Sequence, residues 1–549
     1  MPTRAHVRKR LVRRVTTDRR PRIILCMTPL DALPADDACY LAVKARDARF
    51  DGCFFTGVSS TRIYCRPVCR VRVPKRENCL FFAHAAQAEQ AGYRPCLRCR
   101  PELAPRAPTL AYSPESRVWS IQDASSILAL QAARLMDTPE AWDQTVPTVQ
   151  LLAHRLGVSD RHLRRIFAAQ FGVSPLQYLQ TQRLLSAKQL LTDTTLAVAE
   201  VARLSGFASL RRFNAAFAQA YKLNPTGLRR SCARPTQAGR GAPDQGIHVR
   251  LAYRPPYDAR AMLQFFATRQ VAGIEAVTLA TRNPFLCKTV AVQQNGKHTT
   301  GWLVARFDPD ACRMDLRLSD SLREVLPWVM ARVRAMLDLD ADPHAINNLL
   351  HLRFPTGDGL RVPGALDGFE LAMRAVLGQQ ITVAAARTLA ARLVQRFGEP
   401  IETPWIGLNR LFPTPAALAC ASGDALGQLG IVKQRQAAIQ AIAGAVLDGR
   451  LQLHGGADVA ATVLCLQSLP GVGDWTAQYI AMRALRWPDA FVAGDVALHK
   501  ALGVAQAKNP AKEALAASQA WRPWRSYAVI RAWAALPAAQ KRTQLSATE

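Results

Sequence analysis

Between residues 146 and 230, apolar side chains recur four positions apart, a spacing that places them on one face of an α-helix. Short Gly-containing breaks separate these helical segments. Residues 356–545 are rich in Ala and Leu and have the same helical character. Residues 247–355 instead mix helical segments with short alternating runs, such as the one at 300–307, and this mixture predicts an α+β domain. The whole pattern predicts a mainly α-helical, multidomain protein.

The segment from 146 to 230 contains two loosely similar copies, offset by 50 residues. Equivalent positions carry Leu163 and Phe213, Phe167 and Phe217, Phe171 and Tyr221, and Pro175 and Pro225. Each copy has a short helix, a turn with a glycine, and a second helix that begins at a serine suited to N-capping. These residues are Gly157 and Ser159 in the first copy and Gly206 and Ser209 in the second. The arrangement predicts a doubled helix-turn-helix.

Basic side chains follow the start of the second helix in both copies. They are Arg161, Arg164 and Arg165 in the first copy and Arg211 and Arg212 in the second. A helix-turn-helix places such a helix start in the major groove of DNA. The alternative is a plain helical bundle with a solvated basic face, but arginines at equivalent places in two copies argue against it. The pair resembles the DNA-binding domain of the AraC family, which implies that these arginines contact DNA.

Composition and charge narrow the class of partner. The 549 residues allow three or four domains of roughly 100–200 residues each. Apolar residues make up 49% of the chain, so cores can form, yet no uncharged apolar run reaches the about 18 residues of a membrane span. The net charge is +30: 38 basic and 18 acidic residues precede residue 247, and 33 and 23 follow. Basic charge in both parts favours nucleic acid as the partner, with a membrane surface as the weaker alternative.

The pattern divides the chain into seven expected parts. They are a basic amino-terminal tail (1–37), a Cys-rich domain (38–103), a linker with a helix near Ser120–Met136 (104–145), the double helix-turn-helix (146–233), a linker (234–246), the α+β domain (247–355) and a helical domain (356–545). The second linker, RPTQAGRGAPDQG, is assigned from its composition.

Residues 1–26 hold nine basic residues and one acid without an apolar stretch, so export is not indicated. We interpret them as a disordered basic tail, or as an upstream extension of a chain that starts at Met27; an organellar transit peptide is a further alternative. The 13 cysteines are odd in number and scattered, which fits a reducing compartment. A cytoplasmic, bacterial-type location is expected.

Four cysteines form two closely spaced pairs, Cys65-x3-Cys69 and, after 26 intervening residues, Cys96-x2-Cys99. Two such pairs supply the four soft thiolates that suit one tetrahedral Zn²⁺ ion. Such a site is more often a folding staple for a small domain than a centre of chemistry. Both interpretations stay open on spacing alone.

The neighbouring residues favour chemistry at this site. Segments 54–58, 63–69 and 92–99 closely resemble the amino-terminal domain of the Ada family of alkylation-response proteins. The resemblance implies a small zinc-bound α+β domain in which Cys65 accepts a methyl group from a DNA methylphosphotriester. It also implies that zinc both holds the fold and activates the thiolate. A formal site charge of about −2 would become about −1, which weakens repulsion from DNA phosphate. No Pro-Cys-His-Arg motif is present, so no second transfer domain is expected.

A second motif, LPGVGDWTA at 469–477, contains Gly471 and Gly473 between expected helices at 464–469 and 476–485. Glycines let backbone N–H groups approach a phosphate closely at a helix start, so a helix-hairpin-helix is expected here. Asp495 lies twenty residues past Trp475, after a glycine and before a helical run. An isolated Gly-Asp in that position is more often a helix N-cap than a catalytic carboxylate.

The combination resembles the helix-hairpin-helix DNA glycosylase superfamily. Segments 251–258, 375–380 and 521–528 resemble 3-methyladenine DNA glycosylase II in particular, over about residues 247–540. The resemblance implies a TATA-binding-protein-like domain followed by an all-α catalytic domain, with Asp495 as the catalytic carboxylate. It also implies that Trp475 and Trp533 line a pocket for a flipped, cationic purine. For Tyr479, four residues after Trp475, pocket lining and core packing are equally supported.

Two absences and one departure refine this interpretation. Relatives that also cleave the DNA backbone carry a catalytic lysine where this chain has Trp475, so a monofunctional glycosylase is expected. No cysteine follows Cys465, so the four-Cys iron–sulfur cluster of other relatives is not expected. The family's intercalating wedge is a leucine, and the matching position here is Gln380.

The sequence therefore predicts a methyl-sensing transcriptional regulator joined to a DNA-3-methyladenine glycosylase. Its partners would be alkylated and promoter double-stranded DNA, with no membrane, and the chain is expected to be a monomer associated with the nucleoid. The alternative is a non-catalytic regulator that keeps the glycosylase domain only for docking on DNA.

Overall fold

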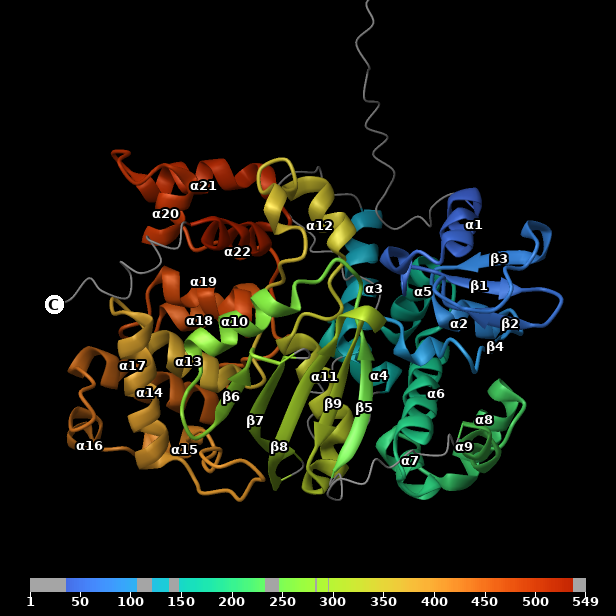
Figure 1. The fold of residues 1–549 in the computed structure, drawn as a ribbon, viewed down its shortest axis with the longest axis horizontal. Helices are drawn as coiled ribbons and strands as arrows, with labels where there is room; N and C mark the ends of the chain where they lie inside the picture. The colour runs from blue at the N-terminus through green and yellow to red at the C-terminus, as the bar shows by residue number, and fades with distance from the viewer. Residues whose placement is uncertain are drawn as a thin grey trace, which may run out of the picture.

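The computed structural model describes residues 36–105, 121–137, 148–232, 246–281, 284–294 and 296–536. Nearly all of the expected basic tail and nearly all of the linker at 234–246 lie outside these residues, as does the linker at 104–145 apart from its first two residues and its helix. None of the helices in the described part of the chain combines the length and hydropathy of a membrane-spanning helix. Figure 1 shows the amino-terminal elements on one side, a sheet in the centre and the carboxyl-terminal helices on the other side.

The Cys-rich domain is the small α+β unit that was predicted. Its sheet has the strand order β3-β1-β2-β4, with β1 antiparallel to β2 and β3, and β2 parallel to β4. The elements are α1 (Asp36–Ala45), β1 (Phe55–Val58), β2 (Ile63–Cys65), β3 (Cys79–Phe82), α2 (Ala85–Gln90), β4 (Arg94–Pro95) and the short 3-10 helix η3 (Pro101–Leu103). Buried aromatic residues hold it together, with Phe55 and Tyr64 in edge contact at 5.7 Å.

The predicted doubled helix-turn-helix is also present. Its helices are α4 (Val149–Arg155), α5 (Asp160–Phe171), α6 (Pro175–Asp193), α7 (Val198–Leu204), α8 (Leu210–Tyr221) and α9 (Pro225–Cys232), preceded by α3 (Ile121–Asp137). The hydroxyls of Ser159 and Ser209 accept hydrogen bonds from the backbone N–H groups of His162 and Arg212, as N-caps do. The two second helices, α5 and α8, therefore begin 50 residues apart, at Asp160 and Leu210.

The α+β domain has a five-stranded antiparallel sheet with the order β5-β9-β8-β7-β6. Its elements are β5 (Ile247–Ala252), α10 (Ala259–Arg269), β6 (Glu275–Thr278), β7 (Phe285–Gln294), β8 (Lys297–Asp308), β9 (Arg313–Leu318), α11 (Leu326–Met336) and α12 (Pro343–Leu350). The alternating run at 300–307 lies in β8, but the strand is buried on both faces rather than on one. Leu303 faces the main core, and Trp302 and Val304 on the other face are covered by Leu408.

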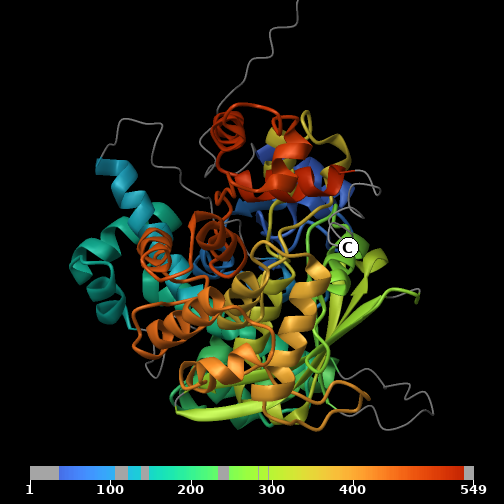
Figure 2. The ribbon, with the colours of Figure 1, turned by 90° about the vertical axis from the view of Figure 1, so that its left-hand side faces the viewer.

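The carboxyl-terminal domain is all-helical, as predicted. Its helices are α13 (Gly368–Leu377), α14 (Val383–Phe397), α15 (Pro415–Ala419), α16 (Gly423–Gly427), α17 (Lys433–Leu447), α18 (Val459–Gln467), α19 (Asp474–Arg483), α20 (Val496–Leu502), α21 (Pro510–Ser518) and α22 (Arg525–Ala535). The helices of the hairpin begin before the predicted 464 and 476, because Asp458 caps α18 and the turn ends at Gly473. Figure 2, turned by 90°, shows these helices packed in several layers.

Candidate functional site

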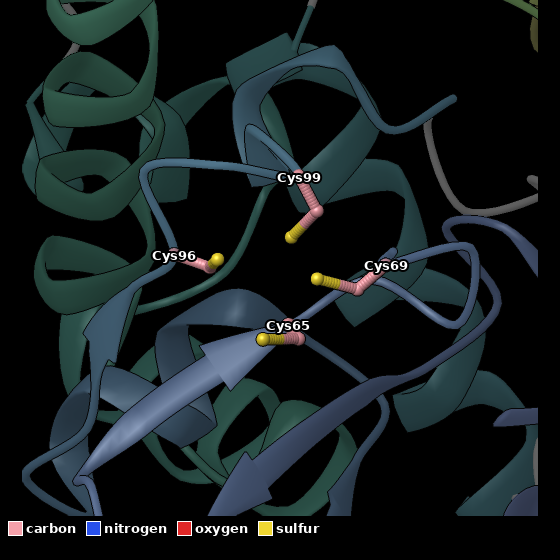
Figure 3. A group of neighbouring side chains, drawn as sticks. All are labelled: Cys65, Cys69, Cys96 and Cys99. Carbon is pink, nitrogen blue, oxygen red and sulfur yellow. The ribbon is translucent and has the colours of Figure 1, made fainter. Parts of the chain in front are cut away.

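The four cysteines predicted as metal ligands converge on one point. Cys65 ends β2, Cys69 follows in the next turn, and Cys96 and Cys99 lie after β4. Their sulfur atoms all lie within 4.8 Å of one another, and Figure 3 shows all four pointing into a common space. A tetrahedral zinc ion with Zn–S bonds of about 2.3 Å needs sulfurs roughly 3.8 Å apart, so the donor set and its spacing fit zinc.

The surroundings of the four sulfurs are not equivalent. The backbone N–H of Arg66 donates to Sγ of Cys99 over 3.4 Å. Backbone N–H groups of Val71 and Cys99 face the sulfurs of Cys69 and Cys96. Within the described part of the chain, the sulfur of Cys65 accepts no such backbone hydrogen bond. Because an N–H donor withdraws electron density from a thiolate, these backbone groups lower the nucleophilicity of the other three sulfurs.

Neighbouring thiols also set the proton affinities in this cluster. Hydrogen bonds from Cys65 and Cys99 lower the pKa of both Cys69 and Cys96, whereas burial raises the pKa of Cys99. The sulfurs thus share protons in the absence of a cation, and a divalent cation would replace those protons. Within the described residues, this is the only group of three or more Cys, His, Asp or Glu side chains placed to hold a metal ion.

The arginines predicted to contact DNA lie on the exposed faces of α5 and α8. They are Arg161, Arg164, Arg165, Arg211 and Arg212. Arg164 pairs with Asp160 at 3.0 Å, and Arg165 contacts the ring of His162 at 3.2 Å. The apolar positions four apart point inward instead, where Phe167 stacks on Phe171 at 4.4 Å. The sequence pattern therefore separated the buried and the basic faces correctly.

Asp495 is the meeting point of two distant tryptophans. The indole N–H of Trp475, at the start of α19, donates to Oδ2 of Asp495 over 3.1 Å. The indole N–H of Trp533, on α22, donates to Oδ1 over 2.9 Å. Asp495 also caps α20, because its Oδ1 accepts the backbone N–H of Leu498 over 2.7 Å. The N-cap interpretation of Asp495 is thus correct, and the same carboxylate lies beside the predicted aromatic residues.

Tyr479 lies against Trp475 and extends the aromatic surface beside Asp495. The two rings stack at 5.1 Å with an angle of 10° between their planes. Arg483 donates to the Tyr479 hydroxyl over 2.5 Å, and its guanidinium lies 4.8 Å from the ring centre of Phe265 on α10. Burial acts to raise the pKa of Tyr479, but the charges of Arg483 and Arg269 outweigh it, so this pKa lies below its usual value. Tyr479 is therefore half-buried: its ring packs on Trp475 and against the core, and its hydroxyl is held by Arg483.

Sequence reasoning missed this group around Tyr479. Arg483 carried a signal, since it follows Tyr479 by four residues and so shares its helix face. Phe265 and Arg269 carried none, because they come from another domain more than 200 residues earlier in the chain. The guanidinium of Arg269 lies 3.8 Å from the ring centre of Phe265.

The hairpin and the predicted wedge position lie side by side. Gly471 has a φ of +74°, and a Cβ atom there would meet the backbone oxygen of Gln434 at 3.0 Å, so this position requires glycine. Gly473, the exposed N-cap of α19, has no such requirement, and a Cβ there would meet nothing within 4 Å. Gln380 is exposed with a φ of +55°.

A second residue missed at the level of sequence, Gln379, ties the Gln380 loop to the hairpin. Its side-chain amide donates to the backbone oxygen of Gly471 and to the hydroxyl of Thr476, both over 2.9 Å. Arg435 donates in turn to the backbone oxygen of Gln379. The loop that presents Gln380 is thus held in a fixed position beside the glycines.

Four protein-family models match successive parts of the chain. They describe the metal binding domain of Ada (residues 38–102), a helix-turn-helix domain (152–231), the AlkA N-terminal domain (248–367) and an HhH-GPD superfamily base excision DNA repair protein (373–526). Their order along the chain is the order predicted from the motifs.

Three curated proteins illustrate the similarity. A probable bifunctional transcriptional activator/DNA repair enzyme AlkA of Mycobacterium tuberculosis is 36% identical over 509 residues, which is 91% of this chain and 96% of that protein. DNA-3-methyladenine glycosylase 2 of Escherichia coli is 34% identical over 52% of this chain and 95% of its own length. The bifunctional transcriptional activator/DNA repair enzyme Ada of Escherichia coli is 36% identical over 27% of this chain and 36% of its own length.

Proposed function

Since this chain belongs to the family of bifunctional transcriptional activator/DNA repair enzymes that join Ada-type and AlkA-type domains, we propose that its carboxyl-terminal half is a monofunctional DNA-3-methyladenine glycosylase and its amino-terminal half a methyl-sensing regulator. The observation that carries the glycosylase proposal is the pair of indole N–H groups on the two oxygens of Asp495. They orient the carboxylate beside the stacked rings of Trp475 and Tyr479.

The proposed reaction follows from this arrangement. An alkylated purine inside a duplex is out of reach, so its nucleotide is flipped out at a cost of a few kcal/mol. Ring alkylation makes the purine cationic, and the electron-rich faces of Trp475, Tyr479 and Trp533 attract it. The glycosidic C–N bond breaks with its electron pair leaving on the base, which becomes neutral. Asp495 stabilises the sugar cation and accepts a proton from the water whose oxygen bonds to the anomeric carbon.

Gln380 would fill the space that the flipped nucleotide leaves. Its exposure and the fixed position of its loop support this role, although its amide is more polar than the family's leucine. The glycines of the hairpin would place the backbone N–H groups at the start of α19 against a DNA phosphate. Gly473 supports this, because the space beside it is open.

The reaction would leave an abasic site without strand cleavage. Trp475 occupies the position at which relatives with lyase activity carry a lysine, and an indole cannot form a Schiff base with the sugar. Borohydride should therefore trap no covalent protein–DNA adduct. Likewise, the iron–sulfur cluster of other relatives is not expected in a chain without cysteines after Cys465, and elemental analysis for iron would check this.

The experiment that tests the glycosylase proposal is release of 3-methyladenine from methylated duplex DNA by the parent protein and by Asp495→Asn. Rapid release by the parent and a loss of about 10²- to 10⁴-fold in the variant are expected. Asp458→Asn is the matched control, because the Asp458 carboxylate caps α18 in the same way but accepts no hydrogen bond from Trp475 or Trp533. If neither protein releases base while DNA binding persists, the alternative of a non-catalytic regulator replaces this proposal.

For the regulator half, we propose one zinc ion held by the four cysteines, with Cys65 as the methyl acceptor. Bound zinc keeps the four sulfurs deprotonated at neutral pH. The Cys65 sulfur attacks the methyl carbon of a phosphotriester, the methyl C–O bond breaks, and the DNA is left with an ordinary charged phosphodiester. The lack of a backbone donor to Cys65 supports this choice among the four. The product, a thioether, lowers the negative charge of the site and so favours DNA binding.

The remaining parts of the proposal concern the partner. DNA would be bound by the starts of α5 and α8 through Arg161, Arg164, Arg165, Arg211 and Arg212, at promoters and near damage. We propose that the chain acts as a monomer on chromosomal DNA, which places it at the nucleoid in the cytoplasm. Light scattering of the protein alone and with a duplex would test the monomeric state.

A further inference from the structure

One buried arginine joins the metal-binding domain to the glycosylase half. Arg254 follows β5 and is 0% exposed. Its Nε donates to the backbone oxygen of Asp51 over 2.7 Å, and Nη2 donates to that of Pro105 over 3.3 Å. On the other side, Nη1 donates to the backbone oxygens of Asp340 and Ala341 over 2.7 and 3.2 Å. A single side chain thus bonds the main chain of two domains, in a place from which water is excluded.

Asp51 continues this connection to the metal ligands. Its carboxylate pairs with the guanidinium of Arg66, and both residues are buried. Arg66 donates through Nη1 to the backbone oxygen of Cys99 over 3.0 Å, and through its backbone N–H to the sulfur of that cysteine. The path from a metal ligand to the glycosylase half therefore consists of Cys99, Arg66, Asp51 and Arg254.

The turn after Asp51 has no space for a side chain at position 52. Gly52 has a φ of +75°, and a Cβ atom there would meet the backbone oxygen of Pro105 at 2.0 Å and the guanidinium of Arg254 at 3.0 Å. The contact between the two domains therefore requires glycine at this position, both for the lack of a side chain and for the backbone conformation.

A second connection runs through the long helix α6. Lys188 pairs with Glu102 and donates to the backbone oxygen of Cys96 over 3.2 Å, while Arg100 pairs with Asp193 at 2.6 Å. The side chains of Lys188, Glu102 and Asp193 are almost completely buried, and that of Arg100 is 14% exposed. The residues that follow Cys96 and Cys99 are thereby fastened to α6.

The helix α6 also packs on the edge strand β5 of the glycosylase half. The amide of Gln189 donates to the backbone oxygen of Arg250 over 2.9 Å. Leu190 and Leu191 of α6 belong to one continuous apolar core with Val249 and Leu251 of β5. Figure 1 shows α6 and β5 side by side. Two separate paths therefore lead from the metal ligands to this half.

From these contacts we infer that metal occupancy at the four cysteines stabilises the glycosylase half, through Arg66, Asp51 and Arg254 and through α6 and β5. A bound cation ties all four sulfurs, which lie within 4.8 Å of one another, to one point, whereas protonated thiols are joined only by weak hydrogen bonds. Metal loss therefore loosens the two segments that carry Arg66, Arg100 and Glu102. Anything that orders those segments also orders their docking surface on the glycosylase half. The inference rests on the proposed zinc centre, but on neither methyl transfer nor base release.

The test is hydrogen–deuterium exchange of the full chain, with zinc bound and after its removal by a chelator, with the zinc content measured on the same samples. Removing zinc should speed exchange in β5 and at residues 338–342 by about tenfold, as well as within 63–103. In Arg254→Met, zinc removal should no longer change exchange at 338–342, while it should still speed exchange at 63–103. Arg306→Met is the matched control, because Arg306 is an exposed arginine on β8 of the same domain.

A second variant covers the case in which Arg254→Met does not fold. Asp51→Asn leaves the hydrogen bonds of Arg254 in place and weakens only the ion pair with Arg66. This variant should still bind zinc, but removing the zinc should change exchange at 338–342 less than it does in the parent. If the purified protein contains its zinc, and removal of that zinc leaves exchange in β5 and at 338–342 unchanged, the inference is overturned and the proposed function is left intact. A protein that binds no zinc would overturn the proposed metal centre, and the inference with it.

Discussion

The indole N–H of Trp533 donates to Oδ1 of Asp495 over 2.9 Å, although the two residues are 38 positions apart and lie on different elements. Trp475 satisfies the other oxygen of the same carboxylate. A carboxylate that accepts hydrogen bonds from two indoles and a backbone N–H is held on both oxygens, so its orientation is fixed.

Trp533→Phe keeps an aromatic face in the pocket but removes the donor to Oδ1. A charge-assisted hydrogen bond is worth roughly 1.5–3 kcal/mol, so single-turnover base release should slow by about tenfold or more. Trp328→Phe, at a partly buried position of α11 in another domain, is the control and should behave like the parent. An unchanged rate for Trp533→Phe would show that Asp495 is oriented without this bond.

Cys65→Ala should abolish transfer of a methyl group from alkylated DNA to the protein, because it removes the proposed acceptor sulfur. Three thiolates remain, and zinc can keep a water in its fourth position, so base release should persist. Mass spectrometry for the added methyl group, with zinc analysis of the same sample, makes the measurement. Continued methylation of the variant would assign the acceptor to another cysteine.

Arg211→Ala combined with Arg212→Ala should weaken duplex binding by the regulator half. Each lost phosphate contact reduces the slope of log K against log salt by about 1, so a decrease of about 2 is expected if both arginines face phosphates. Lys222→Gln changes a charge at the opposite end of α8 and serves as the control. A slope equal to that of the parent would remove this helix start from the DNA interface.

Gln380→Ala should lower base release by about tenfold, because nothing would then fill the gap opposite the flipped nucleotide. Gln380→Leu should equal or exceed the parent, since an apolar side chain stacks better between base pairs. A fluorescent base analogue next to the lesion would report flipping directly. Equal flipping by the parent and Gln380→Ala would place the wedge elsewhere.

Glu89 provides a prediction on pH and stability. Burial raises the pKa of Glu89 to about 7, although the hydroxyls of Thr181 and Tyr64 donate to it. In the unfolded chain this carboxyl ionises near its usual pKa of 4.5. Between these values the folded protein binds the extra proton, so the contribution of Glu89 to stability falls as pH rises from about 4.5 to about 7.

Glu89→Gln removes this titration while it keeps a polar group between Tyr64 and Thr181. Between pH 5 and pH 8, the free energy of unfolding of the parent should fall by about 2 kcal/mol more than that of the variant. Thermal unfolding of both proteins across this range gives the comparison. Glu77→Gln, at an exposed position, should show no such trend, and a parallel course of Glu89→Gln and parent would contradict the assigned pKa.

Several features could be predicted from the sequence because they depend on short spacings. The cysteine pairs at 65 and 69 and at 96 and 99, the two helix-turn-helix copies and the hairpin glycines are each formed within a few residues, where chain geometry restricts the possible arrangements. The same holds for the inward and outward faces of α5 and α8. The expected strand at 300–307 was correct, but its two-sided burial depended on Leu408, about a hundred residues away.

By itself, then, the sequence determined the order of the domains, the metal-ligand set and the chemical character of the candidate site, because local spacing selects helix faces, turns and ligand pairs. Only the tertiary structure decided that Trp533 reaches Asp495, that Gln379 ties the wedge loop to Gly471, and that Arg254 fastens the metal-binding domain to the glycosylase half. These contacts join residues from 38 to 203 positions apart. The physical reason is that a buried donor must find an acceptor once water is excluded, and which acceptor lies within reach depends on how all the elements pack together.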